Sequence, residues 1–441
     1  SESQERMVLA VPPHNFTLLE EICRSEGVDV TAIGEFTTDK KLKLYYNDNL
    51  VCDLDMDFLH EGRPQLQLKA TYRPSDHPEP SFPCPESLDD DLLALLGRWN
   101  TCSKEWVIRQ YDHEVQGSSV LKPLVGQQSD GPGDAAIVRP VPGSERGVVV
   151  SCGINPAYGD VDAYNMAASA IDEAVRQIIA VGGSLDRLAL LDNFCWGSAT
   201  DEVALGALAR AAQACADLSL VYETPFISGK DSLNNQFRVG DKIVSIPHTL
   251  LISAISVMVD TSKAVTMDFK AAGDLIYIIG ETKEELGGSA YYASKGYIGN
   301  ISPAVDPEVA KSLYQRLSAA TDKRLVRACH DLSEGGLGVA LAEMAFAGGF
   351  GAAIELAKVL RDDVIDRDDS VLFSESNSRF LAEVAPDDQH EFEQVMGISS
   401  FDLIGVVAQD VRLVVKGLDG SIVVNQPIVD LKDAWQRPLK W

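Results

Sequence analysis

The chain has 441 residues, of which 45% are hydrophobic and 24% are charged, and its formal net charge is −28. This length predicts roughly two to four domains, each large enough for its own core. The negative charge argues against nucleic acid and anionic membranes as partners, because both bind basic faces. It does not exclude anionic small molecules, since bound Mg²⁺ can neutralise phosphates beside carboxylates.

The cysteines and the apolar stretches bear on where the protein works. Eight cysteines are scattered along the chain without a C-x-x-C pair, which favours reduced thiols over a disulfide framework or a zinc site. No stretch approaches the roughly 18 consecutive apolar residues of a membrane span, and the N-terminus lacks a signal-peptide pattern. We therefore expect a cytoplasmic protein that does not span a membrane.

Residues 1–62 are predicted to form a strand, a helix and two further strands. The apolar run MVLAV begins at Met7, and FTLLEEICRSEG from Phe16 has helical periodicity with a stop at Gly27. VTAIGEF from Val30 and LKLYY from Leu42 alternate in polarity as half-buried strands do.

Residues 63–120 differ in composition from the segments on either side. TYRPSDHPEPSFPCPES is rich in proline and reads as a linker. Ser87 is then predicted to cap a helix, DDDLLALLGRW, whose three aspartates lie at its positive end.

The remaining two segments alternate helices with strands. Residues 121–262 hold two long predicted helices, AYNMAASAIDEAVRQIIAVG and EVALGALARAAQACADL, between the short apolar strands GVVVS, LALLD and LLISAISVMV. Residues 263–441 begin near GDLIYIIG and include the helix LGVALAEMAFAGG. Such alternation predicts an α+β or mixed α/β fold.

The chain contains an internal repeat. SESQERMVLAVPP at Ser1 and SESNSRFLAEVAP at Ser374 share Ser, Glu, Ser, Arg, Val and Pro at equal spacing; Ile-Gly at 33–34 and 404–405, and the strands LKLYY and VRLVV, then follow in both copies. The second copy stands 240 residues after Asp134, whereas the first has nothing before it. We therefore expect the chain to begin inside a tandem A–B–A–B protein, with the first A domain and the start of the first B domain upstream of Ser1.

Two groups of polar residues within residues 121–262 could hold a cation. Asp134, in GPGDAAIVRP, stands before a predicted strand, where a carboxylate binds either a metal ion or its own turn. Glu173 and Gln177 are four residues apart and share one face of a predicted helix. That face offers two oxygen ligands to Mg²⁺, or it is simply solvated.

Two further polar segments follow apolar strands. LLDNFCWG and FISGKDSLNNQF break abruptly into small and polar residues, which is typical either of ligand positions at strand ends or of an Asx-rich turn. In the second of them, Gly229 permits close backbone approach, Lys230 can meet a phosphate, and Ser232 and Asn234 can donate or accept hydrogen bonds.

HDLSEGGLG, from His330, places an Asp, a Ser and a Glu at a glycine-rich helix entrance. Such a segment serves as an N-cap or as a metal or phosphate site. The sequence contains no G-x-x-x-x-G-K-[ST] signature, and the glycines of HDLSEGGLG do not form G-x-G-x-x-G. It also lacks a convincing nucleophile–base arrangement.

Five motifs in order, RQYDHEVQG, GDAAIVRP, ALLDNFCWG, PFISGKDSLN and HDLSEGGLGVALAEMAFAG, resemble phosphoribosylformylglycinamidine synthase over nearly the whole chain. Each motif singly is shared with the wider aminoimidazole ribonucleotide synthetase-like superfamily. The resemblance implies an α+β fold of tandem A–B modules. Its domains would be the C-terminal part of the first B domain (1–62), a linker with a helix (63–120), the second A domain (121–262) and the second B domain (263–441).

The resemblance also implies a reaction of de novo purine biosynthesis. ATP would activate the formyl amide oxygen of formylglycinamide ribonucleotide as an iminophosphate, and ammonia from a glutaminase subunit or domain would displace it. The family's catalytic residues lie in the first A domain, so we expect none here and an inactive isolated chain. The alternatives are a non-catalytic nucleotide-binding half of that enzyme and another ATP-using member of the superfamily, such as a phosphotransferase.

Site residues follow from the resemblance by position. The implied substrate contacts are Glu2, Ser3, Gln4 and Ser232. The implied ATP contacts are Asp192, Gly229, Lys230 and Ser333, with Lys230 standing where the family often has an asparagine metal ligand. An auxiliary site for ADP and Mg²⁺ would take its metal ligands from Asp134, Glu173, Gln177 and Asp331, with Gln177 standing where asparagine is usual.

Overall fold

A computed structural model of the protein describes residues 5–111, 113–397 and 400–440. The chain divides into two compact units, Ser1–Gln67 and Leu68–Trp441, and each is described by itself.

The first unit is small and largely exposed. It contains a short 3₁₀ turn at Pro13–Asn15, helix α1 (Phe16–Ser25), an antiparallel hairpin of β1 (Lys41–Tyr46) and β2 (Asn49–Asp55), and helix α2 (Met56–Glu61). The predicted helix and the LKLYY strand are therefore confirmed. MVLAV and VTAIGEF, predicted as strands, form none.

The missing strand at residues 30–36 has a physical reason that the repeat reveals. Its counterpart in the second copy is β15 (Phe401–Ala408), which pairs with β11 (Leu275–Ile279) on one side and with β13 (Gly351–Glu355) on the other. Within residues 5–67 as described, the only strands are those of the hairpin. A strand without a partner leaves its backbone groups unpaired, and Ile33 and Phe36 remain 82% and 91% exposed.

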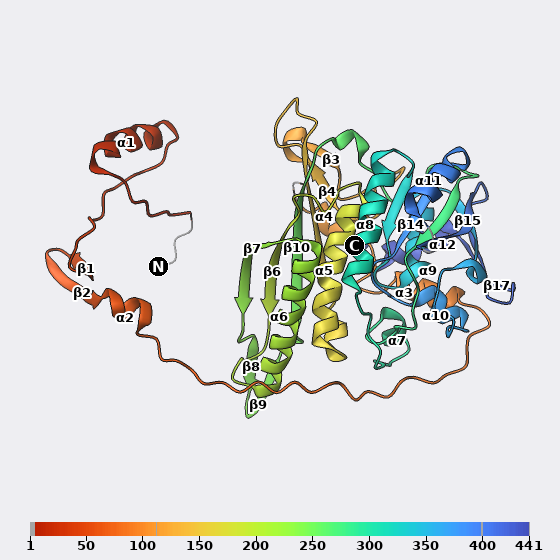
Figure 1. Ribbon diagram of the computed structural model, residues 1–441, viewed down its shortest axis with the longest axis horizontal. Coiled ribbons are helices and arrows are strands. Elements are labelled where there is room, and N and C mark those ends of the chain that lie inside the picture. Colours follow the sequence, from red (N-terminus) through yellow and green to blue (C-terminus); the bar gives the residue numbers. More distant parts are fainter. Residues whose placement is uncertain (1–4, 112, 398–399, 441) are drawn as a thin grey trace. The chain divides into compact units, whose positions relative to one another are not determined.

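The first sheet of the second unit has six strands, and two long helices cover one of its faces. The strand order is β3 (Ser119–Leu121), β4 (Ala136–Val138), β5 (Gly147–Ile154), β10 (Thr249–Met258), β6 (Ala189–Cys195) and β7 (Phe226–Ser232). All neighbours are antiparallel except the parallel pair β6–β7. Helices α5 (Ala163–Ala180) and α6 (Glu202–Tyr222) cover one face, as Figure 1 shows.

Side-chain burial alternates along these strands, so the two faces of the sheet differ. Residues of β5 and β10 that point toward α5 are buried, among them Val149 and Ile252. The opposite face remains open to solvent, with Val150, Ile154 and Ile227 exposed by 42%, 38% and 61%. Alternation of this kind is the mark of a sheet packed on one side only.

Helix α6 is the one described helix whose length and composition would allow it to cross a membrane. Core helices meet the same criteria. Asp201 caps α6 by accepting hydrogen bonds from Val203 N (2.9 Å) and Ala204 N (2.8 Å), and the helix packs on α5 and on α8 (Pro307–Asp322).

A seven-stranded mixed sheet forms the rest of the unit. Its order is β12 (Ala328–Asp331), β14 (Phe380–Val384), β11, β15, β13, β16 (Arg412–Lys416) and β17 (Ile422–Pro427). The apolar helix α9 (Gly336–Gly348) is buried along nearly its full length. Smaller elements complete the unit: α7 (Ala290–Ser294), α10 (Asp368–Phe373), α11 (Gln389–Met396), α12 (Ile428–Gln436) and a hairpin of β8 (Gln236–Val239) and β9 (Lys242–Ser245). The predicted mixed α and β class is confirmed.

The proline-rich segment leads to helices α3 (Asp89–Leu96) and α4 (Glu105–Ile108). The predicted helix exists, but it is shorter than expected and Leu88, not Ser87, occupies its N-cap position. Ser87 Oγ accepts only a long hydrogen bond from Asp89 N, at 3.3 Å. Burial of the leucines of α3 against α9 and α12 holds the helix to the second unit.

Candidate functional site

Five of the predicted residues line one cavity of about 200 Å³: Asp134, Glu173, Gln177, Asp331 and Ser333. They come from the loop before β4, from α5, from the end of β12 and from the turn before α9. Asp331 N donates to Asp134 Oδ1 at 3.1 Å although the two residues are 197 positions apart. The fold therefore gathers this set of residues from three distant segments.

The turn between β12 and α9 depends on glycine. Gly335 and Gly336 have φ of +80° and +58°, which side chains rarely tolerate. A Cβ on Gly336 would also lie 2.2 Å from the carbonyl oxygen of Ser374. Because this turn follows Asp331 directly, it determines where Asp331 and Ser333 stand at the cavity.

His330 lies between two carboxylates. Its Nδ1 is 2.6 Å from Asp134 Oδ1 and its Nε2 is 3.0 Å from Glu343 Oε2. Burial would lower the pKa of His330, but Asp134 and Glu343 outweigh burial and raise that pKa well above its ordinary value. The ring is then an imidazolium whose two nitrogens both donate, so it has no lone pair for a metal ion.

The carboxylates around the cavity are oxygen donors of the kind that hard divalent cations prefer. Ligand atoms of Asp134, His330 and Asp331 lie within 4.8 Å of one another. Since His330 is occupied by its two carboxylates, the donors that suit a cation are Asp134 and Asp331. Glu173 lines the same cavity.

Arg176 is the main positive charge beside this cluster, and sequence reasoning did not single it out. Its Nε donates to Asp331 Oδ2 and its Nη1 to Asp172 Oδ2, both at 2.9 Å. Its Nη2 donates to Ser333 Oγ at 3.0 Å. Burial would lower the pKa of Arg176, but Asp331 and Asp172 raise it instead. An arginine beside Gln177 in the mostly apolar helical run AVRQIIAV was the available signal.

Glu173 and Gln177 connect α5 to the end of β5. Glu173 Oε2 accepts hydrogen bonds from Ile154 N (2.9 Å) and Asn155 Nδ2 (2.8 Å). With its amide turned to satisfy both groups, Gln177 donates through nitrogen to the carbonyls of Cys152 (2.8 Å) and Asp134 (3.0 Å). The amide oxygen of Gln177 is then the atom left for a ligand.

Two of the acids that line this cavity have raised pKa values. Burial raises the pKa of Glu173 to about 7, against the opposing effect of Arg176. Burial, together with the charges of Glu173 and Glu375, raises the pKa of Glu334 to about 8. A cation bound here would displace these protons, because metal ligands must be deprotonated.

The sequence allows three roles for the glycine-rich turn: a helix cap, a metal site or a phosphate site. The N-cap position of α9 is Gly335, so neither Asp331 nor Ser333 caps that helix. Gly335 N donates to Glu375 Oε1 at 2.7 Å, and Glu375 also accepts from Ala290 N and Tyr158 Oη. Because a carboxylate of the chain already fills this anion position, the geometry favours the metal interpretation of the segment.

A second predicted group lies in β6 and β7, away from the cavity. Asp192 pairs with Gly229, and Cys195 with Ser232, along the parallel ladder. Asp192 lies in the strand predicted from LALLD, whereas residues 229–232 were predicted to follow a strand end. That second placement was wrong, because the ladder continues through residues 228–232 and keeps them in β7.

Gly229 has a local reason to be glycine. A Cβ there would lie 2.5 Å from Asp192 Oδ1, so the Asp192 carboxylate rests over the glycine. Beside it, Lys230 Nζ donates to Ser232 Oγ. Burial and the neighbouring Asp231 raise the pKa of Asp192. The predicted substrate contacts Glu2, Ser3 and Gln4 lie outside the described residues.

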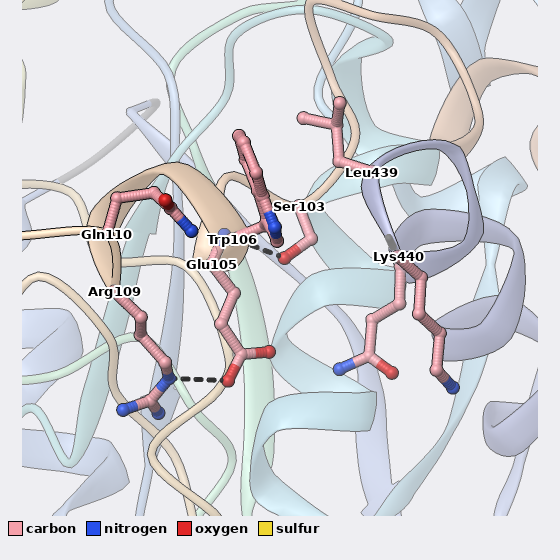
Figure 2. Close-up of a pocket in the computed structure, with 8 residues that line it drawn as sticks. Ser103, Glu105, Trp106, Arg109, Gln110, Leu439 and Lys440 are labelled. Carbon is pink, nitrogen blue, oxygen red and sulfur yellow. Dashed lines mark hydrogen bonds and ion pairs between the residues drawn. The ribbon is translucent and has the colours of Figure 1, made fainter.

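Another cavity, of about 300 Å³, lies elsewhere, and none of the predicted residues lines it. Figure 2 shows it between the segment around α4 and the C-terminal residues Leu439 and Lys440. Glu105 on its wall pairs with Arg109 at 2.7 Å (Figure 2). This cavity lacks the cluster of carboxylates found around Asp134, so we place the candidate site at the smaller one.

Family models match both parts of the second unit. The N-terminal domain of AIR synthase related proteins matches residues 132–246, and the C-terminal domain matches residues 271–417. The chain belongs to the AIR synthase related family. The two matched ranges fall inside the segments expected as the second A and second B domains. The N-terminal match extends past the end of β9.

Relatives that are PurL subunits match all or nearly all of the chain. Phosphoribosylformylglycinamidine synthase subunit PurL of Alkaliphilus metalliredigens is 33% identical, covering 100% of this chain and 58% of that protein. PurL of Thermococcus sibiricus is 34% identical, covering 94% of this chain and 55% of that protein. The chain thus spans little more than half the length of these curated relatives.

Solved structures share the fold. PurL of Thermotoga maritima complexed with FGAR superposes with a TM-score of 0.57 at 19% identity, covering 78% of this chain and 53% of that one. The same protein complexed with ADP gives 0.58 at 18%, covering 78% and 52%. A HypE–HypF complex gives 0.51 at 16%, covering 67% and 93%. At these identities the likeness concerns the fold alone.

Proposed function

We propose that this chain is the C-terminal part of an ATP-dependent ligase that converts formylglycinamide ribonucleotide and glutamine-derived ammonia to formylglycinamidine ribonucleotide. The observation that carries the proposal is the cavity itself. Five residues expected from the motif pattern line it, although they come from distant segments. The PurL relatives supply the reaction by similarity.

In this proposal the cavity is the auxiliary nucleotide site. Asp134, Asp331 and Glu173 would hold Mg²⁺, with the Gln177 amide oxygen beside them. ADP or ATP would bind through that cation, because the cluster is acidic and phosphates need a positive partner there. Ser333, which bonds Asp331 Oδ2 at 2.7 Å, would stand beside the phosphates.

A second, catalytic nucleotide site would be completed outside this chain. Asp192, Gly229 and Lys230 would contact its ATP from the second A domain, and Ser232 would contact the substrate with Glu2, Ser3 and Gln4. The half-exposed face of the six-stranded sheet supports a partner there, since apolar residues such as Val150 and Ile227 remain in solvent. The missing first A domain is the partner we propose, with a cytoplasmic glutaminase subunit or domain as the ammonia source.

The first experiment asks whether the chain carries nucleotide. The purified 441-residue protein is denatured, and the supernatant is assayed for adenine nucleotide and magnesium. Near-stoichiometric ADP supports the auxiliary site within this chain. Absence of nucleotide, together with no thermal shift on adding Mg-ATP, would refute it.

The second experiment asks about the reaction. Supplying the upstream portion should give ATP- and ammonia-dependent amidine formation, whereas the isolated chain should give none. A full-length protein without this activity contradicts the proposal.

The alternative is a non-catalytic half whose nucleotide only stabilises the fold. The fold is shared with a HypE–HypF complex, and a shared fold does not by itself select one reaction. Asp134→Asn and Asp331→Asn in the full-length enzyme separate the two roles. Lost stability with turnover intact marks the site as structural; lost turnover at an unchanged melting temperature marks it as catalytic.

A further inference from the structure

The cavity of about 300 Å³ beside α4, here called the α4 cavity, has no part in the function proposed above. Its lining includes the indole of Trp106, the cationic side chains of Arg109 and Lys440, and the amides of Gln110 and Gln436. Trp106 is 38% exposed and the side chain of Arg109 is 46% exposed. Solvent, and therefore a ligand, can reach both of these side chains.

The charge of the α4 cavity differs from that of the acidic cavity around Asp134. Two positive side chains and the carboxylate of Glu105 line the α4 cavity, whereas carboxylates dominate the lining of the acidic cavity. The chain as a whole has a formal net charge of −28. A local excess of positive charge on such a chain favours an anionic ligand. Because the positive charge comes from side chains, that ligand needs no metal ion.

Hydrogen bonds hold this side of the cavity in place. Arg109 Nε donates to Glu105 Oε1 at 2.7 Å (Figure 2), and its Nη2 donates to the carbonyl of Ser129 at 3.0 Å. Neither bond uses Nη1. Ser103 N donates to the carbonyl of Trp435 at 2.9 Å, which ties the segment before α4 to α12. Groups that are already ordered lose little conformational freedom when a ligand binds.

We propose that the α4 cavity binds a nucleoside monophosphate without magnesium. The indole of Trp106 stacks on the base, since every base has a π-face. Arg109 and Lys440 pair with the phosphate monoester, which carries about −1.5 to −2 charges at pH 7. The amides of Gln110 and Gln436 offer both donors and acceptors to the base or the ribose.

The volume of the α4 cavity agrees with a ligand of this size. Small-molecule sites have volumes of about 300–1,000 Å³, and about 300 Å³ lies at the lower end of that range. The cavity therefore suits one mononucleotide rather than a dinucleotide.

The test measures dissociation constants by calorimetry on the purified 441-residue chain, with EDTA present. The probes are AMP, adenosine and inorganic phosphate. EDTA removes the cation on which phosphate binding in the acidic cavity depends, so the α4 cavity is measured by itself. We expect AMP to bind more tightly than either of the other probes, because it contacts both the indole and the cations. Added salt should weaken AMP but not adenosine.

Variants of Trp106 test the stacking contact. Trp106→Ala should raise the Kd about tenfold for both AMP and adenosine, because it removes the ring on which the base stacks. Trp106→Phe should keep most of the affinity. Trp99→Ala is the matched control, since Trp99 is 66% exposed but does not line the cavity, and it should bind both probes as the unaltered chain does.

Variants of the cations test the phosphate contact. Arg109→Gln and Lys440→Gln should each raise the Kd for AMP about tenfold, the loss of one charge-assisted hydrogen bond. Both should leave adenosine within about twofold. Arg139→Gln is the matched control, because the side chain of Arg139 is 42% exposed, pairs with Glu145 at 3.6 Å and does not line the cavity. It should change neither Kd.

Several outcomes would overturn the inference. AMP that binds with magnesium but not in EDTA belongs to the acidic cavity. Phosphate that binds as tightly as AMP leaves no place for the nucleoside. Equal weakening in Trp106→Ala and Trp99→Ala shows that the indole in the cavity has no special contact. Since these measurements exclude magnesium, their failure would leave the nucleotide site proposed above untouched, and the failure of that site would leave this one untouched.

Discussion

Replacing Arg176 by glutamine tests how the acidic cavity is held together. Arg176 is 3% exposed and forms two ion pairs of 2.9 Å, with Asp172 and Asp331, in a region nearly closed to water. Removing one partner of a buried pair leaves an uncompensated charge and costs about 3–5 kcal/mol. We expect a loss in this range at pH 8, because glutamine can replace only part of the hydrogen bonding.

Arg327→Gln is the matched control. Arg327 pairs with Asp274 at the same 2.9 Å, but its side chain is 44% exposed. Exposed pairs are screened by water and contribute about 0–1 kcal/mol. Urea titration followed by tryptophan fluorescence gives both free energies of unfolding.

The pH dependence sharpens the test. Burial already raises the pKa of Asp331, and Arg176 opposes that rise. Without Arg176 the folded pKa of Asp331 should rise further, so the variant's deficit should be small near pH 5 and grow as the pH rises toward 8. Equal losses in Arg176→Gln and Arg327→Gln, or a deficit independent of pH, would refute the reasoning.

Three further predictions concern other parts of the chain. Gly229→Ala should lower the free energy of unfolding by less than about 1 kcal/mol, because the atom 2.5 Å from the new Cβ is a side-chain oxygen of Asp192 that can rotate away. In Gly206→Ala the new Cβ would lie 2.4 Å from backbone atoms of the linker. This second variant should therefore lower the melting temperature more. Burial, and then a hydrogen bond with Asp274, raises the pKa of Glu383 to about 8, so stability from this group is lost as the pH rises from about 4.5 through 8. Unfolding titrations across this range should show a flatter profile for Glu383→Gln. Amides of residues 30–36 should exchange rapidly in this chain and become protected when the upstream portion is supplied; unchanged exchange would contradict the proposed strand.

Local periodicity and the motif pattern predicted much of the second unit. The helices now seen as α5 and α6 follow from apolar spacing alone, and Glu173 and Gln177 reach the same cavity because four residues make about one turn. Their convergence with Asp134 and Asp331 could not be derived from spacing. It depended on the family resemblance, since contacts across 197 positions arise from topology.

The failures share one physical cause, which is that pairing is decided by distant segments. Residues 30–36 carry a strand pattern without a neighbour, whereas residues 228–232 look like a loop but find β6 beside them. The importance of Arg176 was hidden for the same reason. It acts through Asp331 and Ser333, which lie 155 and 157 positions further along the chain.

The second copy of the repeat forms a buried link within the second unit. Ser374, Glu375 and Ser376 are buried, and Arg379 fixes their loop by donating to the carbonyls of Ser374 and Ser376. The Glu375 carboxylate then links three segments, through Tyr158, Ala290 and Gly335.

All the partners of Glu375 come from segments that precede the phrase in the chain. For the first copy, the segments equivalent to these would have to come from outside residues 5–67. Arg6 is the residue of the first copy that aligns with Arg379.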